Sequence, residues 1–226
     1  MHIPDGFLNS GLAGGLLAGA IAAIGYFFAK VLSAVTAAVG KLAGNNGISL
    51  SSFFPGLSQN AGKYFMKLAI IALWVFAAQM FNISVSSAVS VHLIGGVFAA
   101  VLAGPFAGFL IMSSVLAVQS VFFADGGLLA LGANIFNMAF IGSFLAYYIY
   151  KAFSKKNYYL GICAACFFSV LGAALFCLLE LSCSGAVPFT QAFKDMMSLH
   201  FIFAVAEIML TLILLKLFKS LEAGNE

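Results

Sequence analysis

Long apolar runs alternate with short polar connections along the chain. A helix that crosses a bilayer needs roughly 20 mostly apolar residues to span about 30 Å of hydrocarbon. The pattern predicts seven transmembrane helices, at residues 11–31, 65–83, 89–103, 105–123, 127–150, 158–180 and 197–218. The predicted fold class is therefore all-α, and residues 1–226 are expected to form a single polytopic membrane unit.

Two of these segments are irregular. Segment 89–103 is short for a full span, and a Gly-Pro pair separates it from the next one. Segment 127–150 contains Gly-Ala-Asn at 132–134, which predicts a broken or bent helix. The longest polar connection, residues 32–64, is expected to be a cytoplasmic loop, with some interfacial helix, and not a separate domain.

Composition supports the membrane assignment. Hydrophobic residues make up 63% of the chain and charged residues only 8%, against roughly 25% charged residues in a soluble domain. The mean hydropathy is +1.11. A net charge of +3 without any arginine is poorly suited to nucleic-acid binding, which relies on clustered Lys and Arg. The composition predicts an integral membrane protein.

The lysines predict the orientation of the spans. With seven spans, one side of the membrane holds nine of the ten basic residues, namely Lys30, Lys41, Lys63, Lys67, Lys151, Lys155, Lys156, Lys216 and Lys219. The other side holds only Lys194. Because cytoplasmic loops carry the excess of Lys and Arg, the N-terminus is expected outside and the C-terminus in the cytoplasm.

His2 is the most unusual ionisable residue, because it directly follows Met1. No Lys or Arg precedes Lys30, so we expect no signal peptide ahead of the mature chain. The Met1 amine, the His2 amide nitrogen and the His2 imidazole can then close a five-membered and a six-membered chelate ring on one metal ion. Nickel(II) and copper(II) favour planar nitrogen sites of this kind. The alternative is that His2 is a disordered terminal residue.

Two further histidines lie in or beside predicted spans. His92 falls on the same side as the N-terminus, so it can supply a fourth nitrogen; alternatively, it is a histidine at a helix start that bonds to the backbone. His200 and Glu207 are seven residues apart and therefore share one helical face. They either support the metal ligands, handle protons, or form a structural polar contact between helices.

Polar residues near the fifth span, and the cysteines after it, have mostly structural interpretations. Asp125 precedes a helix and is expected to cap it, while Asn134 and Asn137 are candidates for holding a loop or a ligand. Cys163 and Cys166 lie inside an apolar helix and are best explained as small core residues. No nucleophile is paired with a base and no phosphate-binding loop occurs. The chain is therefore not expected to be an enzyme or to hydrolyse ATP.

Three stretches carry a family resemblance. Residues 1–6 read Met-His-Ile-Pro-Asp-Gly, and the Phe-Asn at 81–82 leads to His-Leu-Ile-Gly-Gly at 92–96. Residues 119–138 include Phe-Phe-Ala-Asp-Gly-Gly and Gly-Ala-Asn-Ile-Phe-Asn. These stretches, together with a last helix around 199–207, resemble the CbiM/NikM family of substrate-binding membrane components of energy-coupling factor (ECF) transporters for cobalt and nickel. The opening and the Phe-Ala-Asp-Gly-Gly block look more like the nickel branch.

The resemblance implies a site and a set of partners. A metal would be bound in a near-planar arrangement by the Met1 amine, the His2 amide and imidazole, and His92, with residues 1–10 as the N-terminal metal-binding segment. Further positions with a supporting or structural role would be Asp5, Asp125, Asn134, Asn137, His200 and Glu207. The transported substrate would be Ni²⁺ or Co²⁺. The implied partners are a transmembrane coupling (T) protein, a cytoplasmic ATPase pair and a small accessory membrane protein, in the plasma (inner) membrane of a prokaryote.

One departure and two alternative functions stay open. Members of the family have a Pro- and Gly-rich loop before the central histidine, whereas residues 83–91 contain neither residue. The conformation of this loop is therefore not predicted. One alternative function is a proton-coupled carrier or channel that uses Glu180, His200 and Glu207. The other is a membrane-embedded enzyme with a histidine-based metal site, which the lack of an acid/base pair beside His2 disfavours.

Overall fold

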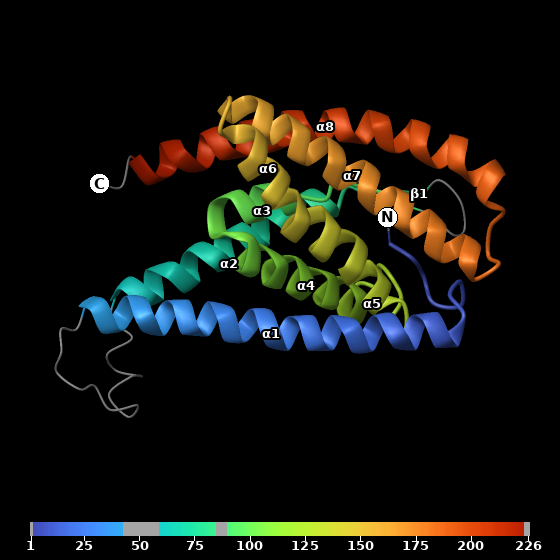
Figure 1. The fold of residues 1–226 in the computed structure, drawn as a ribbon, viewed down its shortest axis with the longest axis horizontal. Coiled ribbons are helices and arrows are strands. Elements are labelled where there is room, and N and C mark those ends of the chain that lie inside the picture. The colour runs from blue at the N-terminus through green and yellow to red at the C-terminus, as the bar shows by residue number, and fades with distance from the viewer. Residues whose placement is uncertain (1, 43–58, 85–89, 224–226) are drawn as a thin grey trace.

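The computed structural model describes residues 2–42, 59–84 and 90–223, which form a helical bundle (Figure 1). The helices are α1 (Ser10–Leu42), α2 (Gln59–Gln79), α3 (Gly96–Ala103), α4 (Pro105–Phe122), α5 (Leu131–Asn134), the π-helix η2 (Ile135–Leu145), α6 (Ala146–Ser154), α7 (Tyr158–Cys183) and α8 (Phe189–Ala223). Strands β1 (Ile83–Ser84) and β2 (Ser90–Val91) pair antiparallel.

Among the described residues, six helical stretches are long and apolar enough to cross a membrane. They are Ser10–Thr36, Gly62–Gln79, Pro105–Phe122, Leu131–Ser154, Tyr158–Cys183 and Ala192–Ser220. Large apolar side chains such as Ile21, Leu73 and Met209 are exposed on their surfaces, as expected of residues that face lipid. The predicted all-α polytopic fold is confirmed.

The third predicted span differs from the expectation. Of the described residues 90–103, only Gly96–Ala103 is helical, and eight residues of helix extend about 12 Å, too short to cross a bilayer. Residues 90–95 are not helical: β2 pairs with β1, and Gly95 adopts a left-handed conformation with φ of 71°. The chain nevertheless travels in the expected direction, since α3 returns toward the lysine end and packs against α2 and α4 (Figure 1).

The predicted irregularity in the fifth span is a change of helix type. Helices α5, η2 and α6 run on without interruption from Leu131 to Ser154, but the backbone hydrogen bonding changes from α to π at Ile135. Residues 124–130 ahead of this span are not helical. The predicted loop 32–64 is shorter than expected, because α1 continues to Leu42 and α2 begins at Gln59. Residues 43–58 lie outside the described part.

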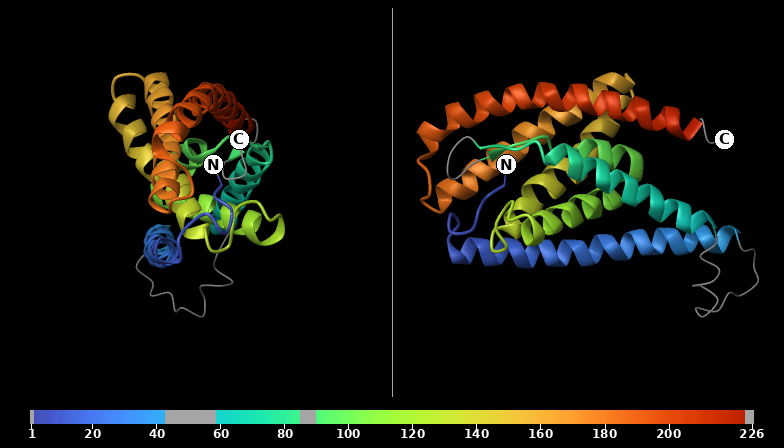
Figure 2. Two further views of the ribbon diagram at one scale, coloured as in Figure 1. Left: turned by 90° about the vertical axis from the view of Figure 1, so that its right-hand side faces the viewer. Right: turned by 180° about the vertical axis from the view of Figure 1, so that it is seen from behind.

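The bundle has two distinct ends (Figures 1 and 2). At one of them, the His2 end, lie residues 2–9, the β1–β2 hairpin, the loop before α5 and the turn between α7 and α8. The opposite end, the lysine end, holds the starts of α2 and α7 and the last turns of α1 and α8. Nine of the ten lysines belong to α1, α2, α6, α8 and the turn between α6 and α7, in segments toward the lysine end, which matches the predicted division between two sides.

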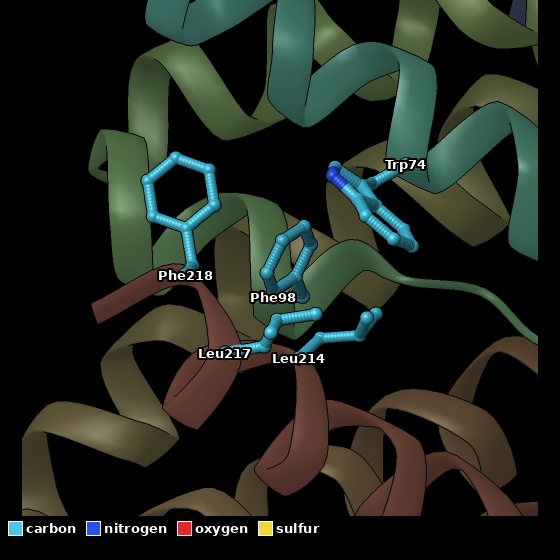
Figure 3. A pocket seen from close by; sticks show the side chains of 5 residues that line it. All are labelled: Trp74, Phe98, Leu214, Leu217 and Phe218. Atoms are coloured by element: carbon cyan, nitrogen blue, oxygen red, sulfur yellow. The ribbon is translucent and has the colours of Figure 1, made fainter. Parts of the chain in front are cut away.

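An apolar recess lies between α2, α3 and α8 (Figure 3). Its lining residues are Trp74, Phe98, Leu214, Leu217 and Phe218. This lining has no carboxylate, imidazole or thiol, the groups that bind metal ions in proteins. The recess is therefore not a candidate for metal binding.

Candidate metal site

The N-terminal segment folds back into the His2 end of the bundle, and its first described residues are buried there. His2 is 3% exposed and Ile3 is fully buried. The Asn134 side chain holds the backbone of Ile3 on both sides: its Oδ1 accepts from the Ile3 amide at 2.8 Å, and its Nδ2 donates to the Ile3 carbonyl at 3.2 Å. A single amide side chain thus pairs with this segment as a neighbouring strand would.

Asp5 anchors the same segment to the loop before α5. Its carboxylate accepts hydrogen bonds from the amides of Leu128, Leu129 and Ala130 at 3.0, 2.8 and 3.1 Å. The Gly127 amide donates to the Ile3 carbonyl at 3.0 Å. A Cβ at Gly127 would overlap the Asp5 carboxylate, so only glycine permits this close approach.

The structure brings His2 and His92 together. Their rings stack with centroids 4.6 Å apart and planes inclined by 28°. His92 is 1% exposed, and its Nδ1 donates to the Leu93 carbonyl at 2.7 Å. Because a carbonyl can only accept, the neutral His92 ring carries its free lone pair on Nε2. That buried atom has no hydrogen-bond partner among the described residues, so it is available to bind a metal.

His2 contacts Asp125, which follows α4. The distance from His2 Nδ1 to Asp125 Oδ1 is 2.8 Å, and Asn82 Nδ2 donates to the same oxygen at 3.1 Å. The intervening residue Ala124 has a φ of 52°, a left-handed conformation that is uncommon for residues with a Cβ. Asp125, expected to cap a helix, instead contacts a histidine of the candidate site.

The surroundings keep both imidazoles neutral. Burial lowers the pKa of His92 well below its usual 6.5. Burial also lowers the pKa of His2, although the hydrogen bond with Asp125 partly offsets this. Burial alone raises the pKa of Asp125, but the contact with His2 outweighs it and holds that pKa below its usual value. Near neutral pH the pair is therefore a neutral imidazole donating to a carboxylate.

The orientation of the His2 ring bears on chelation. A six-membered ring through the His2 amide nitrogen closes on Nδ1, yet in this structure Nδ1 is bonded to Asp125 and the buried Nε2 has no partner among the described residues. Chelation therefore requires the ring to turn about its Cβ–Cγ bond. The turned ring exposes Nδ1 to a metal and moves Nε2 toward Asp125.

The described residues contain no group of three His, Cys, Asp or Glu side chains placed to hold a metal. Two imidazoles alone do not complete a coordination sphere, so the remaining donors of any site here must come from elsewhere. Backbone nitrogens of the segment that carries His2 are one such class of donor. Met1, the predicted source of the terminal amine, lies outside the described residues.

Comparison with known proteins identifies the family. The family model for the cobalt uptake substrate-specific transmembrane region (CbiM) matches residues 2–223. The chain belongs to the CbiM family. Its fold agrees with two crystal structures of transition metal transporters. One, of a truncated form, has a TM-score of 0.78 and 26% identity over 97% of this chain and 99% of that chain. The other has 0.77 and 25% over 99% and 94%.

Curated relatives of this CbiM-family chain are named as transport proteins. A putative fused nickel transport protein NikMN of Archaeoglobus fulgidus is 35% identical over 184 residues, which is 81% of this chain and 53% of the relative. A cobalt transport protein CbiM of Thermosipho melanesiensis is 36% identical over 102 residues, 45% of this chain and 43% of the relative. The chain thus spans about half the length of these relatives.

The other predicted positions of the CbiM-family chain divide into two groups. Glu207 approaches the site through the backbone, because it accepts from the amides of Ile94 and Gly95. Asn137 instead donates to Glu180 at 2.6 Å in the bundle interior, and His200 Nδ1 donates to the Met196 carbonyl at 2.7 Å. The shared helical face of His200 and Glu207 therefore places each of them against a different partner.

Two residues near the site were not predicted. Gln79, fully buried at the end of α2, donates from Nε2 to the Ile94 carbonyl at 2.7 Å. Asn82 donates to Asp125, as described above. For Gln79 the available signal was a polar side chain at the end of an apolar span, where it needs a partner. For Asn82 it was membership of the Phe-Asn pair in the family resemblance.

Proposed function

We propose that this chain captures nickel(II) or cobalt(II) as the substrate-binding membrane component of an ECF-type importer. The observation that carries the proposal is the stacked, buried pair of His2 and His92, in which His92 Nε2 has no hydrogen-bond partner among the described residues. Buried polar atoms are normally paired. An unpaired nitrogen of His92, stacked against the imidazole of the N-terminal segment, therefore suits a bound cation.

The proposed ligands are the Met1 amine, the His2 amide nitrogen, the His2 imidazole and His92. The first three belong to one short stretch of chain and close two chelate rings, so their relative positions follow from covalent geometry. His92 supplies the fourth nitrogen from a separate segment. Four nitrogens in a plane favour nickel(II), whereas zinc(II) prefers a tetrahedron.

The proposed orientation places the His2 end outside the cell and the lysine end in the cytoplasm. The support is the excess of lysines at one end together with the preference of cytoplasmic segments for Lys and Arg. In this orientation the site receives ions from outside. A coupling protein, an ATPase pair that hydrolyses ATP and a small accessory membrane protein would act with the chain in a prokaryotic plasma membrane.

The deciding experiment is a competition titration of the full chain, purified with Met1 as its first residue. N-terminal sequencing verifies that start, and nickel, cobalt and zinc are then compared by calorimetry. We expect nickel and cobalt to bind and zinc to bind poorly. Tighter binding of zinc than of nickel would refute the planar nitrogen site.

Orientation has its own test. Single cysteines replace Lys156 and Lys194 in a chain whose four native cysteines are changed to alanine, and an impermeant thiol reagent is added to intact cells. We expect labelling at position 194 and protection at position 156. The reverse pattern would contradict the proposed orientation without affecting the metal site.

A further inference from the structure

Glu207 of α8 holds the segment that carries His92. The Glu207 side chain is 1% exposed, and both of its carboxylate oxygens are used: one accepts from the Ile94 amide at 2.8 Å and the other from the Gly95 amide at 2.7 Å. These two amides lie two and three residues beyond His92 in the chain. A buried carboxylate thus bonds to the backbone directly beside a proposed ligand.

The local backbone explains why a carboxylate fits there. Gly95 precedes α3 (Gly96–Ala103), and the amides at a helix start have no partner within the helix and carry partial positive charge. An anion is stabilised at that position. On the other side, Gln79 of α2 donates to the Ile94 carbonyl at 2.7 Å. The peptide group between Ile94 and Gly95 is therefore hydrogen-bonded to side chains from two different helices.

We propose that Glu207 is a positioning residue for His92 and that it sets the preference of the site for a planar ion. This inference rests on the proposed function. Glu207 does not itself touch the metal, since both of its oxygens are already bonded to amides. Its role is to hold the 92–95 segment so that His92 Nε2 lies in the plane of the other donors. Binding sites of this kind tolerate displacements of only about 0.5 Å.

Glu180 provides a matched control, because it is the same residue type in a similarly buried position. It lies on α7, is 7% exposed, and accepts from Asn137 Nδ2 at 2.6 Å. Among the described residues, it makes no hydrogen bond to the 92–95 segment. A change at Glu180 alters a buried carboxyl group of the bundle without loosening the segment that carries His92.

The test compares Glu207→Gln with Glu180→Gln in the full chain with its native N-terminus. Glutamine keeps the size of glutamate, but its NH₂ group then faces a backbone donor. We expect E207Q to lower nickel affinity by about 10- to 100-fold, as loss of an outer partner of a metal ligand does. We also expect a weaker visible absorption band of planar nickel(II) and a smaller preference for nickel over zinc. E180Q should match the parent in all three measurements.

The inference would be overturned if E207Q matched the parent in nickel affinity, in the absorption band and in the preference for nickel over zinc. If E207Q does not fold by circular dichroism, Gln79→Leu loosens the same segment from α2. It should shift the same three measurements in the same direction, and parent values in a folded Q79L would overturn the inference. If the parent chain binds neither nickel nor cobalt, the proposed function is overturned as well. If nickel binding is lost in His92→Ala but kept in E207Q, only the positioning role is overturned.

Discussion

Two non-helical segments meet at the His2 end, and they are held in different ways. The loop before α5 and Asn134 hold residues 2–5 through hydrogen bonds between side chains and the backbone. The hydrogen bonds to Leu128 and Leu129 are exposed. Residues 92–95 are held by Glu207 and Gln79, buried side chains on helices that cross the bundle. One segment has a local anchor and the other a tertiary one.

The difference follows from how many donors each segment would supply. Three of the four proposed ligand atoms lie on Met1 and His2, where covalent bonds already set their spacing. A local anchor that keeps the terminus in place is sufficient for them. His92 is alone on its segment, so only tertiary contacts set its distance from the others. Each of the following predictions tests one side of this comparison.

Extending the chain by one glycine before Met1 should abolish nickel binding. The extension moves the amine and breaks the five-membered chelate ring, while leaving every anchor of residues 2–5 in place. Calorimetry on the native and extended chains measures the effect, and a glycine added after Glu226 at the other terminus is the control. Equal affinity of the native and extended forms would show that the terminal amine is not a ligand.

Acid should weaken nickel binding by about 100-fold per pH unit between pH 7 and pH 5. The terminal amine, with an ordinary pKa of about 7.7–8.0, and the amide of residue 2 each release one proton on binding. The imidazoles add little at first, because burial lowers the pKa of both His2 and His92, so protons compete with the metal for them only at lower pH.

Calorimetric titration in buffers of different ionisation enthalpy counts the protons released. A site made of the two imidazoles alone would show almost no pH dependence near neutrality, since both pKa values lie below 6.5. A flat affinity between pH 7 and pH 6.5 would therefore place the site outside the N-terminal chelate.

His92→Ala should lower nickel affinity by more than the roughly 10- to 100-fold that loss of an outer partner costs. The variant loses one donor of four, which water replaces poorly, while Glu207 still holds the backbone. Thermal unfolding followed by circular dichroism should show a folded protein. Parent affinity in this variant would mean that His92 is structural and that the fourth ligand lies elsewhere.

Asn134→Ala should produce the smallest change, about tenfold in nickel affinity, because Asp5 and Gly127 still hold the N-terminal segment. Asn137→Ala is the matched control, since it removes the same side chain three residues away and leaves Glu180 without its partner. It should lower the unfolding temperature without changing affinity. Equal affinity losses in the two variants would argue against a specific role for Asn134.

The sequence predicted the helices well, because hydrophobicity along the chain reports contact with lipid. It failed for residues 90–95, which are not helical and which include two amides bonded to Glu207, more than a hundred residues away. No local pattern contains that information. It predicted the proximity of His2 and His92 from chelate chemistry and topology, whereas their role as ligands stays a prediction. It missed Gln79, because a lone polar residue does not reveal its partner.

Because Glu207 belongs to α8, its hydrogen bonds also couple the position of this helix to the segment that carries His92. The helix runs from Phe189 at the His2 end to Ala223 at the lysine end. Glu207 lies about 24 Å along the helix axis from Ala223, at 1.5 Å per residue. A tilt of about 5° pivoting at Ala223 would move Glu207 by about 2 Å, enough to break hydrogen bonds of the usual 2.7–3.2 Å length. A small rotation applied at the lysine end would thus loosen His92 at the opposite end of the bundle.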